Sequence, residues 1–413
     1  MIIEDIVSQH AEEAAFLWLL RDGAVRAPHY NLKDLADLEE RVEAHLDGLR
    51  VAGEEAWPFC EEGLQRQEVG EVFAGGFFAL DQGRKDWLAP VVDVVLEAPE
   101  TWRGLVSALG WVDRQKLQGQ VVEWLKADEP LLRKFGLGAC AVQRVDCGAY
   151  LARALEDPDA GVREVALRSV GQIRRRELLK PLGDHLQDDH EDCRFRAAWS
   201  ATLLGEPRGL EALRQFVEAS AVHSGAAMEL ALRAMDKGSA MQWVRDLIRD
   251  PAMTRMVVQA TGIIGDPVSV PWLMEKMKVP ELARVAGEAF SLITGIDLAY
   301  DDLEGEWPEG FEAGPTESPE DEDVAMDPDE DLPWPAPELI ARWWATHEAR
   351  FPKGQRLLCG KPISPETCMN VLRNGYQRQR RAAALELALL RPDEPLFNTS
   401  ATAKRQQDLL RMA

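Results

Sequence analysis

The sequence predicts an all-α fold, a solenoid of about seven or eight two-helix repeats. An arginine recurs about every thirty residues, and after each one small and apolar residues return every three or four positions, as on one face of a helix. Such units cannot bury their apolar faces alone, so they stack on one another and offer a long concave surface. The recurring arginines are Arg103, Arg133, Arg163, Arg194, Arg255 and Arg284.

Each repeat is expected to hold two helices. In the unit around Arg163, the residues Val162, Ala166 and Val170 share one helix face, and small side chains there let neighbouring helices approach closely. Glycine supplies the left-handed conformation that ends a helix, and a proline two residues later suits the first turn of the next one. On this basis helices are predicted to end at Gly110, Gly171, Gly205 and Gly265.

The repeat pattern resembles HEAT repeats, specifically the short bacterial type also seen in phycobilisome-lyase-like proteins. The six-residue spacing from Asp157 to Arg163, and again from Asp188 to Arg194, is similar to the Asp/Arg pair of that family. The resemblance implies that the pair bridges adjacent repeats by charge-assisted hydrogen bonds and is structural. The alternative is a ladder of functional arginines on the concave face.

Pattern and charge divide the chain into four regions. The cap is predicted to contain a helix that runs to about Val42, with Asn31 or Asp34 as its N-terminal cap residue. The regions are an N-terminal helical cap (1–55), a HEAT-like repeat solenoid (56–300), an acidic, proline-rich linker or loop (301–337) and a basic C-terminal helical module (338–413).

The last two regions carry opposite charge. Residues 301–331 hold fifteen acidic residues and no basic one, and because like charges repel and proline blocks helices, we expect a solvated, loosely held segment. The alternative is an acidic arm that docks on a basic partner or on the chain's own C-terminal part. Residues 350–413 hold twelve basic and five acidic residues, and Tyr376–Leu390 is predicted to form a helix.

Candidate partner-binding residues lie in these C-terminal parts. Trp334, Trp343 and Trp344 flank the acidic region, and exposed aromatic residues often become interface hot spots. The alternative is that they fix the C-terminal module onto the solenoid. The second group is the basic cluster Arg378, Arg380 and Arg381. Contact with nucleic acid through Arg373–Arg381 is a further alternative, which a net charge of −24 disfavours as the main role.

No catalytic, cofactor or metal motif stands out. None of the six cysteines form a C-x-x-C pair, and Cys140 and Cys193 fall on repeat core positions, where a buried apolar role is expected. The stretch from Asp184 to Cys193 is dense in metal-ligand residue types, but its two histidines are five residues apart and do not share a helix face. A solvated turn between repeats is therefore expected, with no bound metal and no cofactor.

Composition also bears on compartment and partner. Glu4 and Asp5 stand where a secretory signal needs positive charge, and no apolar run approaches the 20 or so residues of a membrane span. We therefore expect the cytoplasm, with reduced thiols. The net charge of −24 disfavours duplex nucleic acid and anionic membranes as partners and favours a basic protein.

Two end motifs extend the resemblance over essentially the whole chain. The sequences of residues 27–35 and 44–53, and of residues 360–363 and 374–387, are similar to those of an uncharacterised bacterial HEAT-repeat family. Genes of that family often lie in type VI secretion neighbourhoods of Gram-negative bacteria. The resemblance implies an accessory, adaptor or immunity protein whose partner is a secretion effector or spike component, and it implies no catalytic residues.

We therefore expect a non-enzymatic scaffold that captures a protein partner on its concave face. The alternative is an enzyme of the lyase-like HEAT group that acts on a prosthetic group, an interpretation that rests on the repeat type alone.

Overall fold

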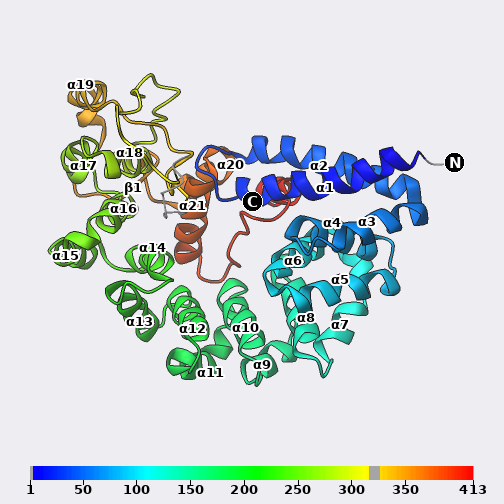
Figure 1. Cartoon of the computed structure of the whole chain (residues 1–413). Helices are drawn as coiled ribbons and strands as arrows, with labels where there is room; N and C mark the ends of the chain where they lie inside the picture. The colour runs from blue at the N-terminus through cyan, green and yellow to red at the C-terminus, as the bar shows by residue number, and fades with distance from the viewer. Residues whose placement is uncertain (1–2, 316–325, 413) are drawn as a thin grey trace. The chain divides into compact units, whose positions relative to one another are not determined.

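The computed structural model describes residues 3–315 and 326–412 and has an all-α, HEAT-like α-solenoid fold (Figure 1). Among these residues, β-structure is confined to a two-residue hairpin, β1 (Leu357–Leu358) and β2 (Lys361–Pro362), and one isolated bridge. Contacts divide the chain into unit 1, residues Met1–Gly209 with Pro392–Ala413, and unit 2, residues Leu210–Arg391. The residues of the predicted C-terminal module are thus shared between the two units.

Unit 1 is a stack in which every second helix packs on the next. The helices α4, α6, α8, α10 and α12 contact one another in that order, and α5, α7, α9 and α11 lie between them in the sequence. The elements of unit 1 are α1 (Glu4–Ala24), α2 (Leu32–Ala52), α3 (Trp57–Leu64), α4 (Val69–Asp81), α5 (Lys85–Glu97), α6 (Trp102–Trp111), α7 (Gln120–Leu125), α8 (Pro130–Gln143), α9 (Ala149–Leu155), α10 (Ala160–Gln172), α11 (Leu179–Asp184), α12 (Glu191–Leu203) and α22 (Ala403–Met412).

The N-terminal helices form a hairpin that is continuous with this stack. Asn31 caps α2 as predicted: its side chain accepts from two main-chain N–H groups, and the carboxylate of Asp34 accepts from the Asn31 N–H. The buried indole of Trp18 on α1 stacks on Phe73 of α4 at 4.8 Å and donates to the Ser107 hydroxyl at 2.9 Å. The cap is therefore joined to the repeats by packing as well as by sequence.

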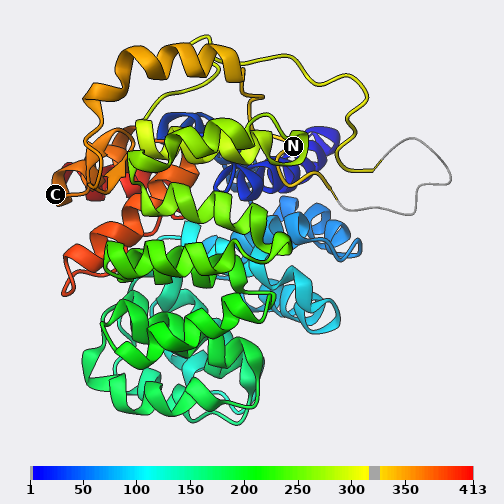
Figure 2. The same ribbon diagram turned by 90° about the vertical axis from the view of Figure 1, so that its left-hand side faces the viewer.

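Unit 2 repeats the same packing, since α14 packs on α16 and α16 on α18; the light-green helices of this unit run side by side in Figure 2. Its core gathers buried side chains such as Val285, Phe290 and Ile340. The elements are α14 (Ser224–Ala234), α15 (Lys237–Leu247), α16 (Thr254–Ile264), α17 (Val270–Lys276), α18 (Pro280–Thr294), α19 (Pro337–His347), β1, β2, α20 (Pro365–Asn374) and α21 (Gln377–Leu390), while α13 (Pro207–Glu218) contains the division between the units.

Two of the four predicted helix-ending glycines are confirmed. Gly205 and Gly265 have φ values of 81° and 73° and follow α12 and α16. Gly110 and Gly171 instead lie inside α6 and α10, so that part of the prediction is wrong. At Gly171 the reason is close packing: a Cβ atom there would stand 2.6 Å from the Ser200 hydroxyl of α12. Within the described residues, no helix combines the length and the apolar character needed to cross a membrane.

Candidate functional site

A row of ion pairs joins successive repeats in unit 1. Arg133 of α8 donates to both carboxylate oxygens of Asp157, at 2.7 and 2.9 Å, and Arg163 of α10 binds Asp188 in the same way, at 3.1 and 3.0 Å. Both guanidinium groups also donate to main-chain carbonyls in the turn before their own helix. The prediction that these charges bridge adjacent repeats is confirmed: the arginine of one repeat holds the aspartate of the next.

Both aspartates of this row are held in the ionised form. Burial alone would raise the pKa of Asp157, but hydrogen bonds from Arg133 and from the main chain outweigh it and lower the pKa. The same balance lowers the pKa of Asp188, where Arg163 and His185 stabilise the carboxylate against the effect of burial. The row is therefore a constant structural feature at neutral pH.

Replacing Arg163 by alanine is expected to lower the free energy of unfolding by about 2 kcal/mol, because the Asp188 side chain, only 6% exposed, loses two charge-assisted hydrogen bonds. The midpoint of urea denaturation measures the loss. The matched control is Arg208→Ala, which breaks a pair with Glu206 whose arginine is 67% exposed and should cost less than about 1 kcal/mol. Equal losses for the two variants would contradict a structural role of the row.

In unit 2 the acidic segment supplies the carboxylates. Asp329 accepts from Arg255 of α16 at 2.9 and 2.5 Å, and Asp327 pairs with Arg284 of α18 at 2.7 Å. The recurring arginines of the repeats thus bind the end of the acidic segment. The alternative, docking of this segment on the C-terminal module, does not describe these contacts. The expectation of a loosely held segment does not hold for this end; residues 316–325, which it also covers, lie outside the described residues.

The three tryptophans named as partner-binding candidates pack within unit 2. Trp334, only 9% exposed, lies against Trp307 at 5.1 Å between ring centroids. Trp343 and the buried Trp344 of α19 meet Phe290 of α18 edge-on, at 5.8 and 6.4 Å. For these last two residues the alternative interpretation, that they fix the C-terminal module onto the repeats, is confirmed. A partner-binding role stays a prediction.

The three candidate arginines differ in exposure. Arg380 is fully buried and donates to a main-chain carbonyl at 2.8 Å. Arg378 pairs with Glu288 of α18 at 3.0 Å, and Arg381 pairs with Glu229 of α14 at 2.9 Å. The basic cluster at the start of α21 is thus partly neutralised within unit 2, and in this structure a partner would meet only the exposed parts of Arg378 and Arg381.

Unit 1 binds a segment of its own chain, which we call the strap (residues 392–402). The strap has no regular structure, and the ends of α8 and α10 hold its main chain. Arg144 donates to the Leu396 carbonyl at 3.1 Å, and Arg174 donates to the Glu394 carbonyl at 3.0 Å. The Leu396 N–H donates to the Gln172 carbonyl at 2.8 Å. These helix ends therefore bind a polypeptide main chain.

The N-terminal hairpin holds the other end of the strap. Arg21 of α1, which is 3% exposed, donates to the carbonyls of Ser400 and Ala401, both at 2.9 Å, and to Glu39 of α2 at 2.9 Å. The second oxygen of Glu39 accepts from the Ala403 N–H at 2.6 Å. Hydrogen-bond donors and acceptors thus follow one another along the surface, which matches the groups of a main chain.

Positive charge gathers beside the strap. Arg114 and Arg405 both donate to the Gln143 side chain, at 3.1 and 2.7 Å. Burial, together with the charges of Arg168 and Arg405, lowers the pKa of Arg144 to about 9. Burial and the charge of Arg114 lower the pKa of Arg405. Burial is the larger cause of both shifts, and the neighbouring positive charges add to it. Arg174 binds the strap, and Arg176 lies 4.0 Å from Asp393 of the strap. We call these two residues, with Arg114, Arg144 and Arg168, the arginine row.

The prediction from sequence missed this surface, although one signal was readable. Gln143-Arg144 and Gln172-Ile173-Arg174 stand about one repeat period apart, just where two stacked helices end. A glutamine followed by an arginine at successive helix ends indicates a repeated polar edge. Nothing in the sequence indicates that residues 392–402 would occupy that edge.

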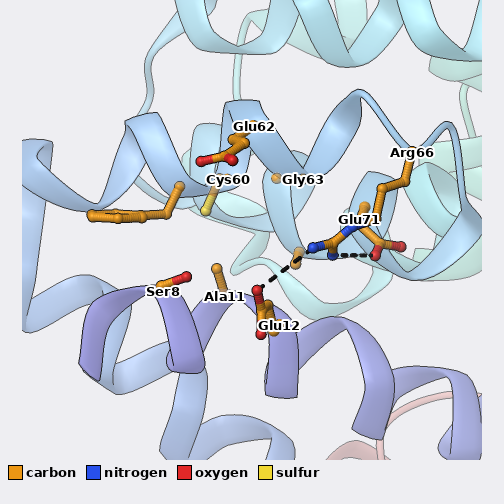
Figure 3. Close-up of a pocket in the computed structure, with 11 residues that line it drawn as sticks. Ser8, Ala11, Glu12, Cys60, Glu62, Gly63, Arg66 and Glu71 are labelled. Atoms are coloured by element: carbon orange, nitrogen blue, oxygen red, sulfur yellow. Dashed lines mark hydrogen bonds and ion pairs between the residues drawn. The ribbon is translucent and has the colours of Figure 1, made fainter. Parts of the chain in front are cut away.

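A small crevice lies between α1, α3 and α4 (Figure 3). Arg66 spans it and pairs with Glu12 at 3.5 Å and with Glu71 at 3.1 Å. Cys60 contributes to the lining, and burial raises the pKa of its thiol to about 12, which makes it a poor nucleophile at neutral pH. The crevice measures about 60 Å³, far less than the 300–1,000 Å³ or so of ordinary small-molecule pockets.

Cys147 is expected to be the first cysteine that iodoacetamide alkylates. Its hydrogen bond with Cys140 lowers its pKa, whereas burial raises the pKa of Cys193 and Cys368 to about 11 and that of Cys359 to about 12. Mass spectrometry of peptides after brief labelling at pH 8 measures the order. Cys140→Ala should slow the labelling of Cys147, because the hydrogen bond is lost. Faster labelling of Cys368 would contradict the expectation.

Within residues 3–315 and 326–412, no group of three or more His, Cys, Asp or Glu side chains is placed to hold a metal ion. Of the ligand-rich stretch, residues 185–190 lie between the two helices as predicted, whereas Asp184 ends α11 and residues 191–193 begin α12. There His185 lies 2.8 Å from Asp188, whose carboxylate already binds Arg163 of the preceding repeat.

The helix pairs, their stacking order and the Arg–Asp pairs between repeats together describe a repeat solenoid. Residues 149–228 match the family model of HEAT repeats. The matched HEAT repeats begin at α9 and include the pair between Arg163 and Asp188. No curated protein matches the chain.

Proposed function

We propose that this protein is a non-enzymatic scaffold that binds a partner protein. The observation that supports it is the strap: helix ends of the HEAT repeats hold an irregular polypeptide segment through its main chain, with Arg144 and Arg174 as donors and Gln172 as acceptor. A surface that binds one segment in this way has the groups needed to bind another.

Within this class we propose a role in type VI secretion, as an accessory or adaptor protein or as an immunity protein, with an effector or spike component as the partner. The support is the resemblance of residues 27–35, 44–53, 360–363 and 374–387 to a family whose genes often lie in such neighbourhoods. Both roles place the protein in the cytoplasm of the producing cell. Deleting the gene blocks delivery without harm to the producer if it encodes an adaptor, and permits self-intoxication if it encodes an immunity protein.

The test is capture of partners by the tagged full-length chain from its own cells at low salt, followed by mass spectrometry and by light scattering of the purified complex. Recovery of an effector or spike component at fixed stoichiometry would support the proposal. Recovery of a small molecule without any protein would overturn it in favour of the lyase-like enzyme. That alternative rests on the repeat type alone.

A further inference from the structure

Most of the hydrogen bonds that hold the strap reach its main chain; its side chains add the bond from the Asn398 amide to the Val142 carbonyl at 3.4 Å. Asp393, whose side chain is 93% exposed, and its neighbours Glu394 and Pro395 all lie exposed, whereas Leu396 is 8% exposed. The hydrogen bonds from Arg144, Arg174 and Arg21 reach main-chain carbonyls that any residue carries. A different segment with the same irregular backbone and one apolar anchor can therefore make the same contacts.

The charges favour an occupant more acidic than the strap. The arginine row contributes five guanidinium groups, and the strap contributes two carboxylates, of Asp393 and Glu394. Asp393 lies 4.0 Å from Arg176, at the limit of an ion pair. Burial and the charge of Arg176 lower the pKa of Arg174 to about 10, and the charge of Asp393 opposes this lowering. Because five guanidinium groups gather beside the strap, a further carboxylate placed along the row is stabilised.

The pattern of hydrogen-bonding groups selects a polypeptide over a nucleic acid. Beside the arginines, the Gln172 carbonyl accepts the Leu396 N–H of the strap, and the Glu39 carboxylate accepts the N–H of Ala403, the residue that follows the strap. A sugar–phosphate backbone has no N–H donors, and its phosphates would be repelled by the Glu39 carboxylate. The surface thus combines cations for acidic side chains with acceptors for amide groups.

We propose that the arginine row of unit 1 is the docking site for an acidic, irregular segment of a partner protein, which binds by displacing the strap. This inference rests on the proposed function and names the surface and the chemistry of the partner. The strap belongs to the same chain, so it competes at an effective concentration in the millimolar range and keeps weak ligands out. The net charge of the whole chain predicts a basic partner; this local surface selects an acidic segment.

The test measures binding of a fluorescein-labelled synthetic peptide with the sequence of residues 392–402 to the full-length protein. In one protein variant the strap is weakened by Asp393→Lys, Glu394→Lys and Leu396→Ala, two of which are exposed positions. Fluorescence anisotropy should show at least tenfold tighter binding to this variant than to the unchanged protein. Thermal unfolding of both proteins shows that the variant is folded.

Changing the peptide tests the chemistry of the occupant. A peptide with Asp393→Lys and Glu394→Lys should bind at least tenfold more weakly, and one with Pro395→Asp, an exposed position between the carbonyls that Arg174 and Arg144 bind, should bind several-fold more tightly, each difference shrinking as salt is added. Equal binding of the three peptides would overturn the proposal. Tighter binding of a single-stranded oligonucleotide than of the acidic peptide would also overturn it, in favour of a nucleic acid.

Changing the surface tests the location. In the variant with the weakened strap, Arg168→Glu with Arg176→Glu should abolish peptide binding, whereas Arg153→Glu with Lys180→Glu, an equal charge change at exposed positions of α9 and α11, should not. An equal effect of the two pairs would overturn the assignment. If the captured natural partner still binds the Arg168/Arg176 variant, the inference fails and the scaffold function stands. Peptide binding without any captured protein would instead count against the scaffold function.

Discussion

Replacing Glu386 by alanine is expected to lower the free energy of unfolding of unit 2 by about 3–5 kcal/mol. Glu386 of α21 has a side chain that is 3% exposed, and it accepts from Arg233 of α14 at 3.0 Å and from Arg356 at 2.6 Å. Arg233 is itself buried. Without the shared carboxylate, two guanidinium groups stay in a poorly solvated site, and the other partner of Arg233, Glu229, is 3.9 Å away. A buried charge that is so poorly compensated costs more than a lost surface pair. Chemical denaturation followed by circular dichroism measures the loss.

The matched control is Glu275→Ala in the same unit, since Glu275 forms an ion pair with Lys278 in which both side chains are more than half exposed. Such a pair contributes about 0–1 kcal/mol. Glu386→Gln should lie between the two, because the amide oxygen still accepts one hydrogen bond without carrying charge. A loss at Glu386 as small as that at Glu275 would show that water solvates the two arginines.

Replacing Arg21 by alanine is expected to lower the free energy of unfolding of unit 1 by about 3–5 kcal/mol at pH 8 and by less at pH 5. Burial raises the pKa of Glu39, and the charge of Arg21 opposes that rise. Without Arg21 the pKa of Glu39 rises further above its value in the unfolded chain. The folded state then binds a proton more readily than the unfolded state, so stability declines as pH increases through that range.

Denaturation at several pH values between 5 and 8 tests this dependence. The control Arg26→Ala breaks a pair with Asp22 in which the arginine is 58% exposed, so its effect should be small and independent of pH. A loss for Arg21→Ala that is the same at pH 5 and pH 8 would mean that Arg21 acts through the carbonyls of Ser400 and Ala401 rather than through Glu39.

The parts of the fold that could be predicted are those fixed by local periodicity. The thirty-residue spacing of arginines, the helix face of Val162 and Ala166, and the capping residue Asn31 all describe interactions within one helix or between neighbouring repeats. The glycine rule failed at Gly171 because glycine serves two physical purposes. A left-handed turn and a close approach of two helices both require glycine, so the sequence does not tell them apart. At Gly171 the requirement comes from Ser200, which lies one repeat further along the chain.

The candidate site could not be predicted because it joins distant segments. Arg144 meets Leu396 across some 250 residues, and Arg21 meets Ser400 across nearly 380. The sequence instead points to aromatic and basic residues near the C-terminus as partner-binding candidates. Composition reveals where such residues are frequent, but not which of them are buried by the rest of the fold. Arg380, which is fully buried, shows how a basic cluster in sequence becomes part of a core.

Unit 1 is assembled from two stretches of chain between which the whole of unit 2 is inserted, and this has a consequence for its synthesis. On the ribosome, residues 210–391 take on the order of ten to forty seconds to translate after Gly209. During that interval the nascent chain carries Arg21, Glu39 and Arg144 before the strap has been made. A partner that is present during translation meets an uncovered arginine row, and one that arrives later must compete with the strap.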